Sequence, residues 1–157
     1  MPSKSRFKNK RPGADKNGMR NHFLLCFIVL SVSLSANNQV SSDENGDGRA
    51  DTWTVFEEGR RQTVLYDSDF DGQVDFALKY GKNSQIVEQQ QDFNRDGEMD
   101  DFYFFENEVL VRREMDTNYD GEIDIRVYLK EGIYITRYEQ DTNFDGEVDK
   151  VKSFEAQ

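Results

Sequence analysis

The feature that most constrains this chain is an acidic segment that recurs five times at a nearly constant spacing. The five segments read DENGDGRAD from Asp43, DSDFDGQVD from Asp67, DFNRDGEMD from Asp92, DTNYDGEID from Asp116 and DTNFDGEVD from Asp141. Their first residues lie 24 or 25 positions apart. Such a period is typical of an architecture built from one repeated supersecondary unit. Residues 43–154 are therefore predicted to form one repeat domain, and we call its acidic segments loops 1 to 5.

Two strand-like runs joined by a short turn lie between successive loops. After loop 1 the runs are TWTVF and RRQTVLY, joined by EEG, and after loop 3 they are DFYFF and VLVRREM, joined by ENE. Aromatic and β-branched runs bounded by Gly or Asn favour strands and turns, and no helical periodicity is visible. The sequence thus predicts an all-β fold, an antiparallel β-meander or β-hairpin repeat array of about nine strands with the acidic loops along one edge. Whether the sheet stays open, curls or closes is left open, as is whether runs such as DFYFF are covered on both faces.

Each loop carries oxygen-bearing side chains in the pattern that a hard cation requires. Position 1 is always Asp, position 3 Asp or Asn, position 5 Asp, position 6 Gly and position 9 Asp. Ca²⁺ takes about six to eight oxygen ligands, and glycine allows the sharp turn with positive φ at position 6. Side chains at positions 1, 3, 5 and 9 and the main-chain carbonyl at position 7 are the expected ligands. The apolar residue at position 8 is expected to point into the core.

The candidate ligand set comprises five residues from each loop. They are Asp43, Asn45, Asp47, Arg49 and Asp51 in loop 1, Asp67, Asp69, Asp71, Gln73 and Asp75 in loop 2, Asp92, Asn94, Asp96, Glu98 and Asp100 in loop 3, Asp116, Asn118, Asp120, Glu122 and Asp124 in loop 4, and Asp141, Asn143, Asp145, Glu147 and Asp149 in loop 5. A plain hairpin turn would need only Asp-Gly or Asn-Gly. It would not need three acids, which repel one another when no cation lies among them. We therefore interpret the loops as calcium sites, up to five in number.

The loops lack the ligand that closes the cage of an EF-hand. Position 12, where an EF-hand has a bidentate glutamate, is Thr54, Leu78, Tyr103, Val127 or Lys152. Weak sites with dissociation constants of about 10⁻⁴ to 10⁻³ M are therefore expected, the range of extracellular modules. Magnesium needs a tighter octahedron and should compete poorly. Zinc would lack its preferred His and Cys ligands.

The loop pattern D-x-[DN]-x-D-G-x-x-D resembles the calcium loops of thrombospondin type 3 repeats, dockerins and integrin-type propeller repeats. The integrin-type repeat is much longer, and dockerin loops are followed by helices, which DFYFF and IRVYL do not favour. A closer resemblance is to repeats of secreted bacterial proteins of the form D-T-D-G-D-G-x-x-D-x-W-x-Y-Y-x-x-G-x-L. The matching segments are DENGDGRADTWTVFEEG and DTNYDGEIDIRVYLKEG. This resemblance covers residues 43–154 and implies calcium binding and secretion.

The first 36 residues differ from the rest in charge and hydropathy. An apolar run, FLLCFIVLSVSL at residues 23–34, follows Arg20 and precedes Ser35 and Ala36. A basic start, a short apolar run and small residues are typical of a signal peptide, and the run is shorter than the roughly 20 residues of a membrane-spanning helix. We expect residues 1–36 to be cleaved, with Met19 as an alternative start and residues 37–42 as a short linker. The mature chain would be secreted, periplasmic or at the cell surface without a membrane span, and an uncleaved anchor is the alternative.

The remaining residues are strongly acidic and narrow the range of functions. Residues 37–157 hold 13 basic and 30 acidic residues, a net charge of −17, which disfavours binding to nucleic acid. They contain no His or Cys, and acids outside the loops, such as Asp101, Glu106 and Glu114, show no pairing pattern, so an enzyme is not expected. The leading hypothesis is a calcium-stabilised structural or binding module whose aromatic side chains contact a glycan or protein partner. The alternatives are a calcium-dependent carbohydrate-active enzyme and a calcium buffer or sensor.

Overall fold

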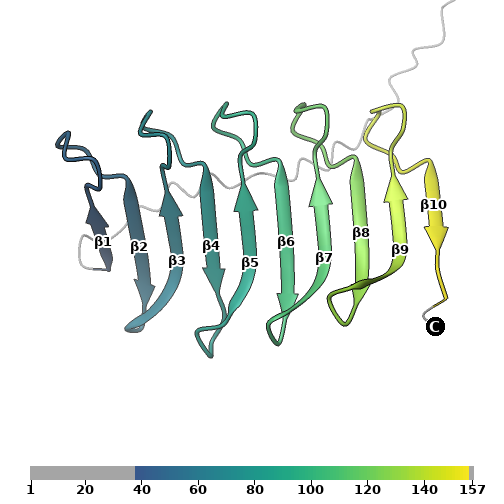
Figure 1. Ribbon diagram of the computed structural model, residues 1–157, viewed down its shortest axis with the longest axis horizontal. Coiled ribbons are helices and arrows are strands. Elements are labelled where there is room, and N and C mark those ends of the chain that lie inside the picture. Colours follow the sequence, from purple (N-terminus) through teal and green to yellow (C-terminus); the bar gives the residue numbers. More distant parts are fainter. Residues whose placement is uncertain (1–37, 156–157) are drawn as a thin grey trace, which may run out of the picture. The chain divides into compact units, whose positions relative to one another are not determined.

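The structure is a computed structural model that describes residues 38–155, and these form one antiparallel sheet of ten strands (Figure 1). The order of the strands in the sheet is their order in the sequence. The strands are β1 (Gln39–Ser42), β2 (Thr52–Glu57), β3 (Arg60–Tyr66), β4 (Phe76–Tyr80), β5 (Ile86–Gln91), β6 (Asp101–Glu106), β7 (Val109–Met115), β8 (Ile125–Lys130), β9 (Tyr134–Gln140) and β10 (Lys150–Ser153). The predicted all-β meander is confirmed. The expected signal peptide, including Met19, lies outside the described residues.

The sheet has one strand more than the repeat pattern predicted. Residues 37–42 were expected to be a linker, but Gln39–Ser42 form strand β1, which pairs with β2 from Gln39 opposite Val55 to Ser42 opposite Thr52. The linker prediction was wrong because QVSS is short and polar, and its sequence carries no strand signal of its own. Its backbone is held in place by pairing with the adjacent strand, and local β propensity does not predict such pairing.

Short turns connect successive strands at the edge of the sheet opposite the acidic loops. In the turn between β2 and β3, Glu58 and Gly59 have φ angles of 50° and 76°. Asn107 and Glu108, between β6 and β7, have φ angles of 50° and 66°. Two consecutive residues with positive φ are the mark of turns whose twist matches that of the flanking strands. These turns return each strand beside its neighbour, so all five acidic loops lie on the same side of the sheet (Figure 1).

The sheet is a single layer among the described residues, with no helix and no second sheet packed against it. Only Val64, Ala77 and Phe102 are buried hydrophobic residues within residues 38–155. The buried polar residues in this part of the chain are all aspartates: Asp51, Asp67, Asp75, Asp92, Asp100, Asp101, Asp116, Asp124 and Asp141. Most of the buried residues in residues 38–155 are therefore aspartates, and this part of the chain has no apolar core of ordinary size.

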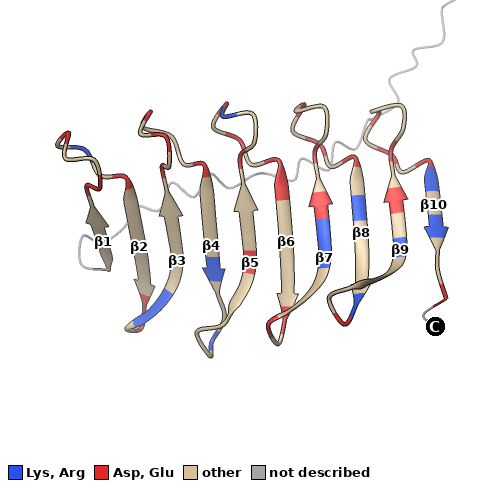
Figure 2. Cartoon of the chain, in the orientation of Figure 1, with Lys and Arg blue, Asp and Glu red and all other residues tan. Residues whose placement is uncertain are grey.

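Long charged side chains cover the aromatic rings on the faces of the sheet. The guanidinium of Arg112 lies 4.0 Å from the ring centre of Phe104, and that of Arg137 lies 5.8 Å from the ring centre of Tyr128. Figure 2 shows Lys and Arg on strands β7 to β10, whereas Asp and Glu line the loop edge. Aliphatic stems and cation–π contacts of this kind shield apolar surface that a second layer would otherwise bury.

Candidate metal sites

Each acidic loop is closed by a main-chain hydrogen bond at its base. The N–H at position 9 donates to the carbonyl of the residue before position 1, as in Asp75 to Tyr66 at 2.8 Å and Asp124 to Met115 at 2.9 Å. The same bond is present in all five loops: Asp51 to Ser42, Asp75 to Tyr66, Asp100 to Gln91, Asp124 to Met115 and Asp149 to Gln140. Positions 1 and 9 are thereby held close together at the base of the loop.

The carboxylate at position 1 organises the interior of its loop. In loop 4 the Oδ1 atom of Asp116 accepts the N–H of Tyr119 at 2.7 Å, and its Oδ2 atom accepts the N–H of Gly121 at 2.7 Å. The equivalent carboxylates of the other loops accept the same two amides. Glycine at position 6 was predicted to have positive φ, and Gly121 does, at 86°.

The left-handed residue at position 4 was missed by sequence analysis. This position has positive φ in every loop: Gly46, Phe70, Arg95, Tyr119 and Phe144. Its amide must point inward to reach the carboxylate at position 1, and the left-handed conformation achieves this. The only signal in the sequence is Gly46, because the other four residues are of types that rarely adopt positive φ. The aromatic side chains at this position, those of Phe70, Tyr119 and Phe144, are 45–49% exposed.

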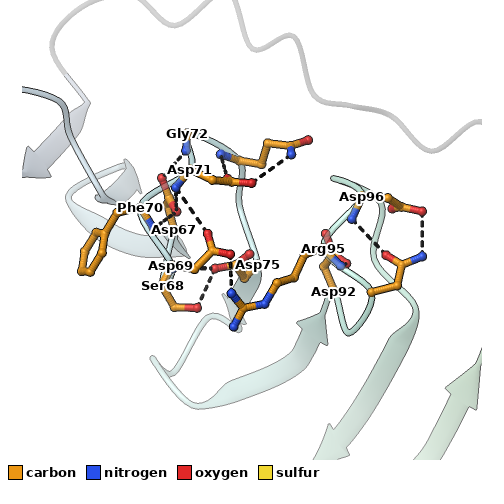
Figure 3. Close-up of polar contacts among 12 residues, drawn as sticks. Asp67, Ser68, Asp69, Phe70, Asp71, Gly72, Asp75, Asp92, Arg95 and Asp96 are labelled. Carbon is orange, nitrogen blue, oxygen red and sulfur yellow. Dashed lines mark hydrogen bonds and ion pairs between the residues drawn. The ribbon is translucent and has the colours of Figure 1, made fainter.

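The carboxylate at position 9 binds the start of the loop. In loop 2 the Oδ2 atom of Asp75 accepts the amide of Ser68 at 2.6 Å and its hydroxyl at 2.5 Å (Figure 3). In loop 3 the residue at the same position is Phe93, which donates only its amide to Asp100, at 2.7 Å. Position 2 was not among the predicted site residues. Where it carries a hydroxyl, as in Ser68, it gives the carboxylate at position 9 an additional hydrogen bond.

The pKa values of Asp75 and Asp100 shift in opposite directions, because the two carboxylates differ in their hydrogen-bond donors and in the charges beside them. Burial alone would raise the pKa of Asp75, but the bonds from the hydroxyl and amide of Ser68 and the amide of Asp69, with the charge of Arg95, bring it below its usual value. Burial raises the pKa of Asp100, and the charges of Asp92 and Asp96 add to the increase, which two amide bonds only partly offset. Like charge at position 9 is therefore less well compensated in loop 3 than in loop 2.

Hydrogen bonds explain much of the acidic pattern without an ion. Backbone amides supply hydrogen-bond donors to the carboxylates at positions 1 and 9. These carboxylates are buried in most loops, with Asp67 at 3% and Asp124 at 2% exposure. An ionised carboxylate has about four acceptor sites, so two or three N–H bonds leave room for a metal. Bonds of this kind also orient metal-ligating carboxylates in known sites.

Three loops bring three carboxylates together. One oxygen from each acid lies within 4.8 Å of the others in each of three sets: Asp43, Asp47 and Asp51 of loop 1, Asp67, Asp69 and Asp71 of loop 2, and Asp116, Asp120 and Asp124 of loop 4. Among the described residues, loops 3 and 5 form no cluster this tight. The structure thus gathers the predicted acids most closely in loops 1, 2 and 4.

Other predicted ligands are engaged in contacts within the loop edge. The Nδ2 atoms of Asn94, Asn118 and Asn143 donate to the acid at position 5, over 2.7, 2.8 and 3.2 Å. Asp69 forms an ion pair with Arg95 of the next loop (Figure 3). At position 7 the amides of Arg49, Gln73, Glu98, Glu122 and Glu147 donate to the position-5 carboxylate. Their carbonyls stay predicted ligands.

The residue at position 8 is not a core residue. Ala50, Val74, Met99 and Ile123 are half-buried, and Val148 is exposed. The prediction of core packing was wrong because the single-layer sheet offers no interior beneath the loops. The apolar side chains instead lie along the loop edge beside buried carboxylates.

Neighbouring loops contact one another through positions 6 and 7. A Cβ atom added to Gly97 would collide with the side-chain oxygen of Gln73, and one added to Gly146 would collide with a carboxylate oxygen of Glu122. The main chain joins the same loops, since the amide of Asp92 donates to the carbonyl of Asp75 at 2.8 Å. The requirement for glycine at position 6 is thus conformational in all five loops and also steric at Gly97 and Gly146.

We expect Gly146→Ala to lower the free energy of unfolding by about 1–3 kcal/mol. The alanine would have to adopt a φ of 84° and would displace the side chain of Glu122. Gly48→Ala is the matched control, because its φ is 91° but nothing lies within 4 Å of the added Cβ. Urea unfolding of both variants separates the conformational cost from the loop contact, and equal losses would contradict the contact.

Comparison with known proteins identifies the type of fold only. No family model and no curated protein matches the chain. Among solved structures, accessory secretory proteins 1, 2 and 3 of Streptococcus pneumoniae match with 20% identity and a TM-score of 0.48 over 69% of this chain and 20% of that chain. A GtfA/B complex bound to UDP and GlcNAc matches with 10% identity and a TM-score of 0.50 over 79% of this chain and 25% of that chain. The chain therefore spans a fifth to a quarter of the length of these chains, and the second likeness concerns the sheet alone.

The described part of the chain also bears on membrane association. No helix within residues 38–155 is long and apolar enough to cross a membrane. The apolar run at residues 23–34 lies outside this part.

Proposed function

We propose that this chain is a calcium-binding repeat protein, in which Ca²⁺ ions along the loop edge stabilise an exported structural or binding module. The observation that carries the proposal is the convergence of three carboxylates in each of loops 1, 2 and 4, with one oxygen of each within 4.8 Å of the others. Oxygen-only ligand sets with several carboxylates suit Ca²⁺. Loops 3 and 5 have the same ligand pattern and would need a small rearrangement to hold an ion, so up to five ions are proposed.

The negative charge along the loop edge favours loops that bind a divalent cation over loops that act only as turns. The five loops hold 16 carboxylates at positions 1, 3, 5 and 9, on one side of a single sheet. Loops on every second strand of a sheet stack roughly 10 Å apart, about one Debye length at 0.1 M salt, so their charges repel one another. Backbone amides orient these acids but neutralise none of them. Each bound Ca²⁺ would remove two negative charges from this row.

The thin sheet supports a stabilising role for the ions. Small domains that bury little apolar surface are commonly stabilised by metals or disulfides. Only three hydrophobic residues are buried within residues 38–155, and this part of the chain has no cysteine. Calcium binding would therefore be coupled to folding, because the ligands converge only when the loop is formed.

We further propose a non-catalytic role, with a surface glycan or a protein as the partner. Two of the acids outside the loops, Asp101 and Glu114, are held in ion pairs. Asp101 pairs with Arg113 at 2.6 Å, and Glu114 lies 3.1 Å from Arg112 and 3.5 Å from Arg126. The half-buried aromatic rings on the faces of the sheet offer a surface for such a partner.

Calorimetric titration of the processed protein with CaCl₂ tests the proposal. We expect measurable binding with dissociation constants of about 10⁻⁴ to 10⁻³ M, and much weaker binding of Mg²⁺. The absence of any calcium-specific heat across this range would contradict it.

Asp47→Asn is expected to weaken the loop 1 site about tenfold or more while leaving the metal-free stability unchanged. The asparagine oxygen can still accept the amide of Arg49, which Asp47 accepts at 2.8 Å, so only the charge is lost. Glu44→Gln is the matched control, because it removes one charge from the same loop but Glu44 is not in the cluster. Equal effects of the two variants on calcium binding would show that general charge, and not ligation, attracts the ion.

A further inference from the structure

The two outer strands of the sheet each have one unpaired edge. Strands β1 and β10 pair only with β2 and β9 within the described residues, and all four residues of each are exposed. In a meander alternate strands run in the same direction, so β1 runs with β3 and β10 runs with β2. Strand β10 of one molecule and β1 of another would therefore meet in the same antiparallel sense as β2 and β3.

A main-chain hydrogen bond that links each pair of neighbouring loops has no counterpart at these two outer edges within residues 38–155. The amide at position 1 of each later loop donates to the carbonyl at position 9 of the loop before it, always at 2.8 Å: Asp67 to Asp51, Asp92 to Asp75, Asp116 to Asp100 and Asp141 to Asp124. Within residues 38–155 the Asp43 amide has no preceding loop to donate to, and the Asp149 carbonyl has no following loop to accept from. Asp43 and Asp149 are also the only exposed acids at positions 1 and 9 in this range.

The free backbone groups of the two edges fall in the same register. The Phe154 amide donates to Thr136 of β9, so by the alternation of an antiparallel ladder Val151 and Ser153 direct their backbone groups outward. At the other edge the Phe56 amide donates to Asn38, so Gln39 and Ser41 direct theirs outward. Placing Asp149 opposite Asp43 of a second molecule also places Val151 opposite Ser41 and Ser153 opposite Gln39. This register repeats that of β2 and β3, in which Thr52 lies opposite Tyr66, the residue before loop 2.

The loops show the same complementarity. The side chains of Gln73 and Glu122 lie against the glycine of the next loop. Gly48 in loop 1 has nothing within 4 Å of an added Cβ, and the same is true of Gly72 in loop 2, which follows a loop with Arg49 at position 7. Glu147 in loop 5 occupies the position that makes this contact in loops 2 and 4. A second copy placed by the strand register would bring Glu147 of one molecule beside Gly48 of the other.

The lysines of β10 do not project beyond its edge. Lysine on an outer strand commonly prevents edge-to-edge pairing. Here the ammonium of Lys150 lies 5.8 Å from the ring centre of Tyr138, and that of Lys152 lies 5.0 Å from the ring centre of Phe154. Both charges are thus held over a face of the sheet, which leaves the backbone edge accessible.

We propose that copies of this chain assemble head to tail, with β10 of one copy pairing with β1 of the next. The occupant of each open edge is a second copy, because each edge supplies the backbone groups, register and loop contact that the other lacks. Such an interface is heterologous and does not close on itself, so assembly extends one continuous sheet with the acidic loops along one side. The inference rests on the backbone and does not depend on calcium binding.

Light scattering coupled to size-exclusion chromatography tests this assembly with the protein in its processed, exported form. The contact is small, so we expect a mass that rises with concentration between about 10 µM and about 1 mM. Ser41→Pro removes an outward amide from β1, and Val151→Pro removes one from β10, without loss of a bond inside the sheet. Each variant alone should be monomeric. Their equimolar mixture should form a dimer and nothing larger, because each retains the edge that the other has lost. Ser41→Ala and Val151→Ala keep both amides and should assemble like the unaltered chain.

Several results would overturn the proposal. They are a monomer at all concentrations, unimpaired assembly of both proline variants, or a mixture that stays monomeric. A closed dimer abolished by only one of the two prolines would show that like edges pair, which also contradicts it.

A crosslinking test does not depend on proline being tolerated. The double variant Ser41→Cys, Val151→Cys, with Cys26→Ser, should form disulfide-linked ladders under mild oxidation, because residues opposite each other in an antiparallel pair lie at a distance that a disulfide can span. The two positions lie on opposite edges of the ten-stranded sheet, so the bond can form only between molecules. Replacing Ser42, which faces β2, in place of Ser41 should reduce crosslinking strongly, and equal crosslinking would contradict the register.

Discussion

About 5 mM calcium is expected to raise the melting temperature of the processed protein by about 20 °C or more over its value in excess chelator. At dissociation constants of about 10⁻⁴ to 10⁻³ M, each occupied loop would stabilise the folded state by about 1–2 kcal/mol. Five such loops sum to about 5 kcal/mol or more, a large fraction of the net stability of a small domain. The effect is large because the sheet has only three buried hydrophobic residues within residues 38–155.

Thermal melts followed by circular dichroism provide the measurement. Salt also screens the repulsion between loops, so 5 mM MgCl₂ and NaCl of equal ionic strength are the controls. A calcium effect well above both controls would support ligation. Equal melting temperatures in calcium and chelator would remove the basis of the proposed function.

Asp101→Ala is expected to lower the free energy of unfolding by about 3 kcal/mol. Asp101 is 1% exposed, and its carboxylate accepts the Nε atom of Arg113 at 2.9 Å, the Nη2 atom at 2.6 Å and the hydroxyl of Tyr103 at 2.8 Å. Removal of the acid would leave the partly buried guanidinium without its partner. The value lies at the low end for a buried pair, because the Arg113 side chain is 37% exposed.

Urea unfolding of this variant should be compared with that of Glu88→Gln. Glu88 pairs with Lys79 at 2.8 Å, but the lysine side chain is 43% exposed, so a loss below about 1 kcal/mol is expected. Because Asp101 lies outside every loop cluster, Asp101→Ala should leave calcium affinity unchanged. A loss for Asp101→Ala no larger than for Glu88→Gln would mean that this buried pair contributes little to the sheet.

Sequence reasoning located nine of the ten strands and all five loops. Runs such as TWTVF and IRVYL carry their own β propensity, and the loops are marked by Asp and Gly at fixed positions. Strand β1 was missed, because QVSS becomes a strand only beside β2. The ion pair of Asp101 was also missed, since Arg113 is 12 residues away and is brought opposite Tyr103 by the register of β6 and β7.

The amino-acid sequence by itself determined the repeat, the formation of β-strands between the loops and the arrangement of acids along one edge. These features depend on local composition and on a fixed spacing. Only the tertiary structure decided that the sheet formed by residues 38–155 is open and single-layered, that most of its buried residues are aspartates such as Asp67 and Asp124, and that three loops gather their acids more closely than the other two. The reason is that burial and convergence depend on which groups of neighbouring repeats come into contact. That contact is set by strand register and by donors such as the amides at positions 4 and 6, which no single residue type reveals.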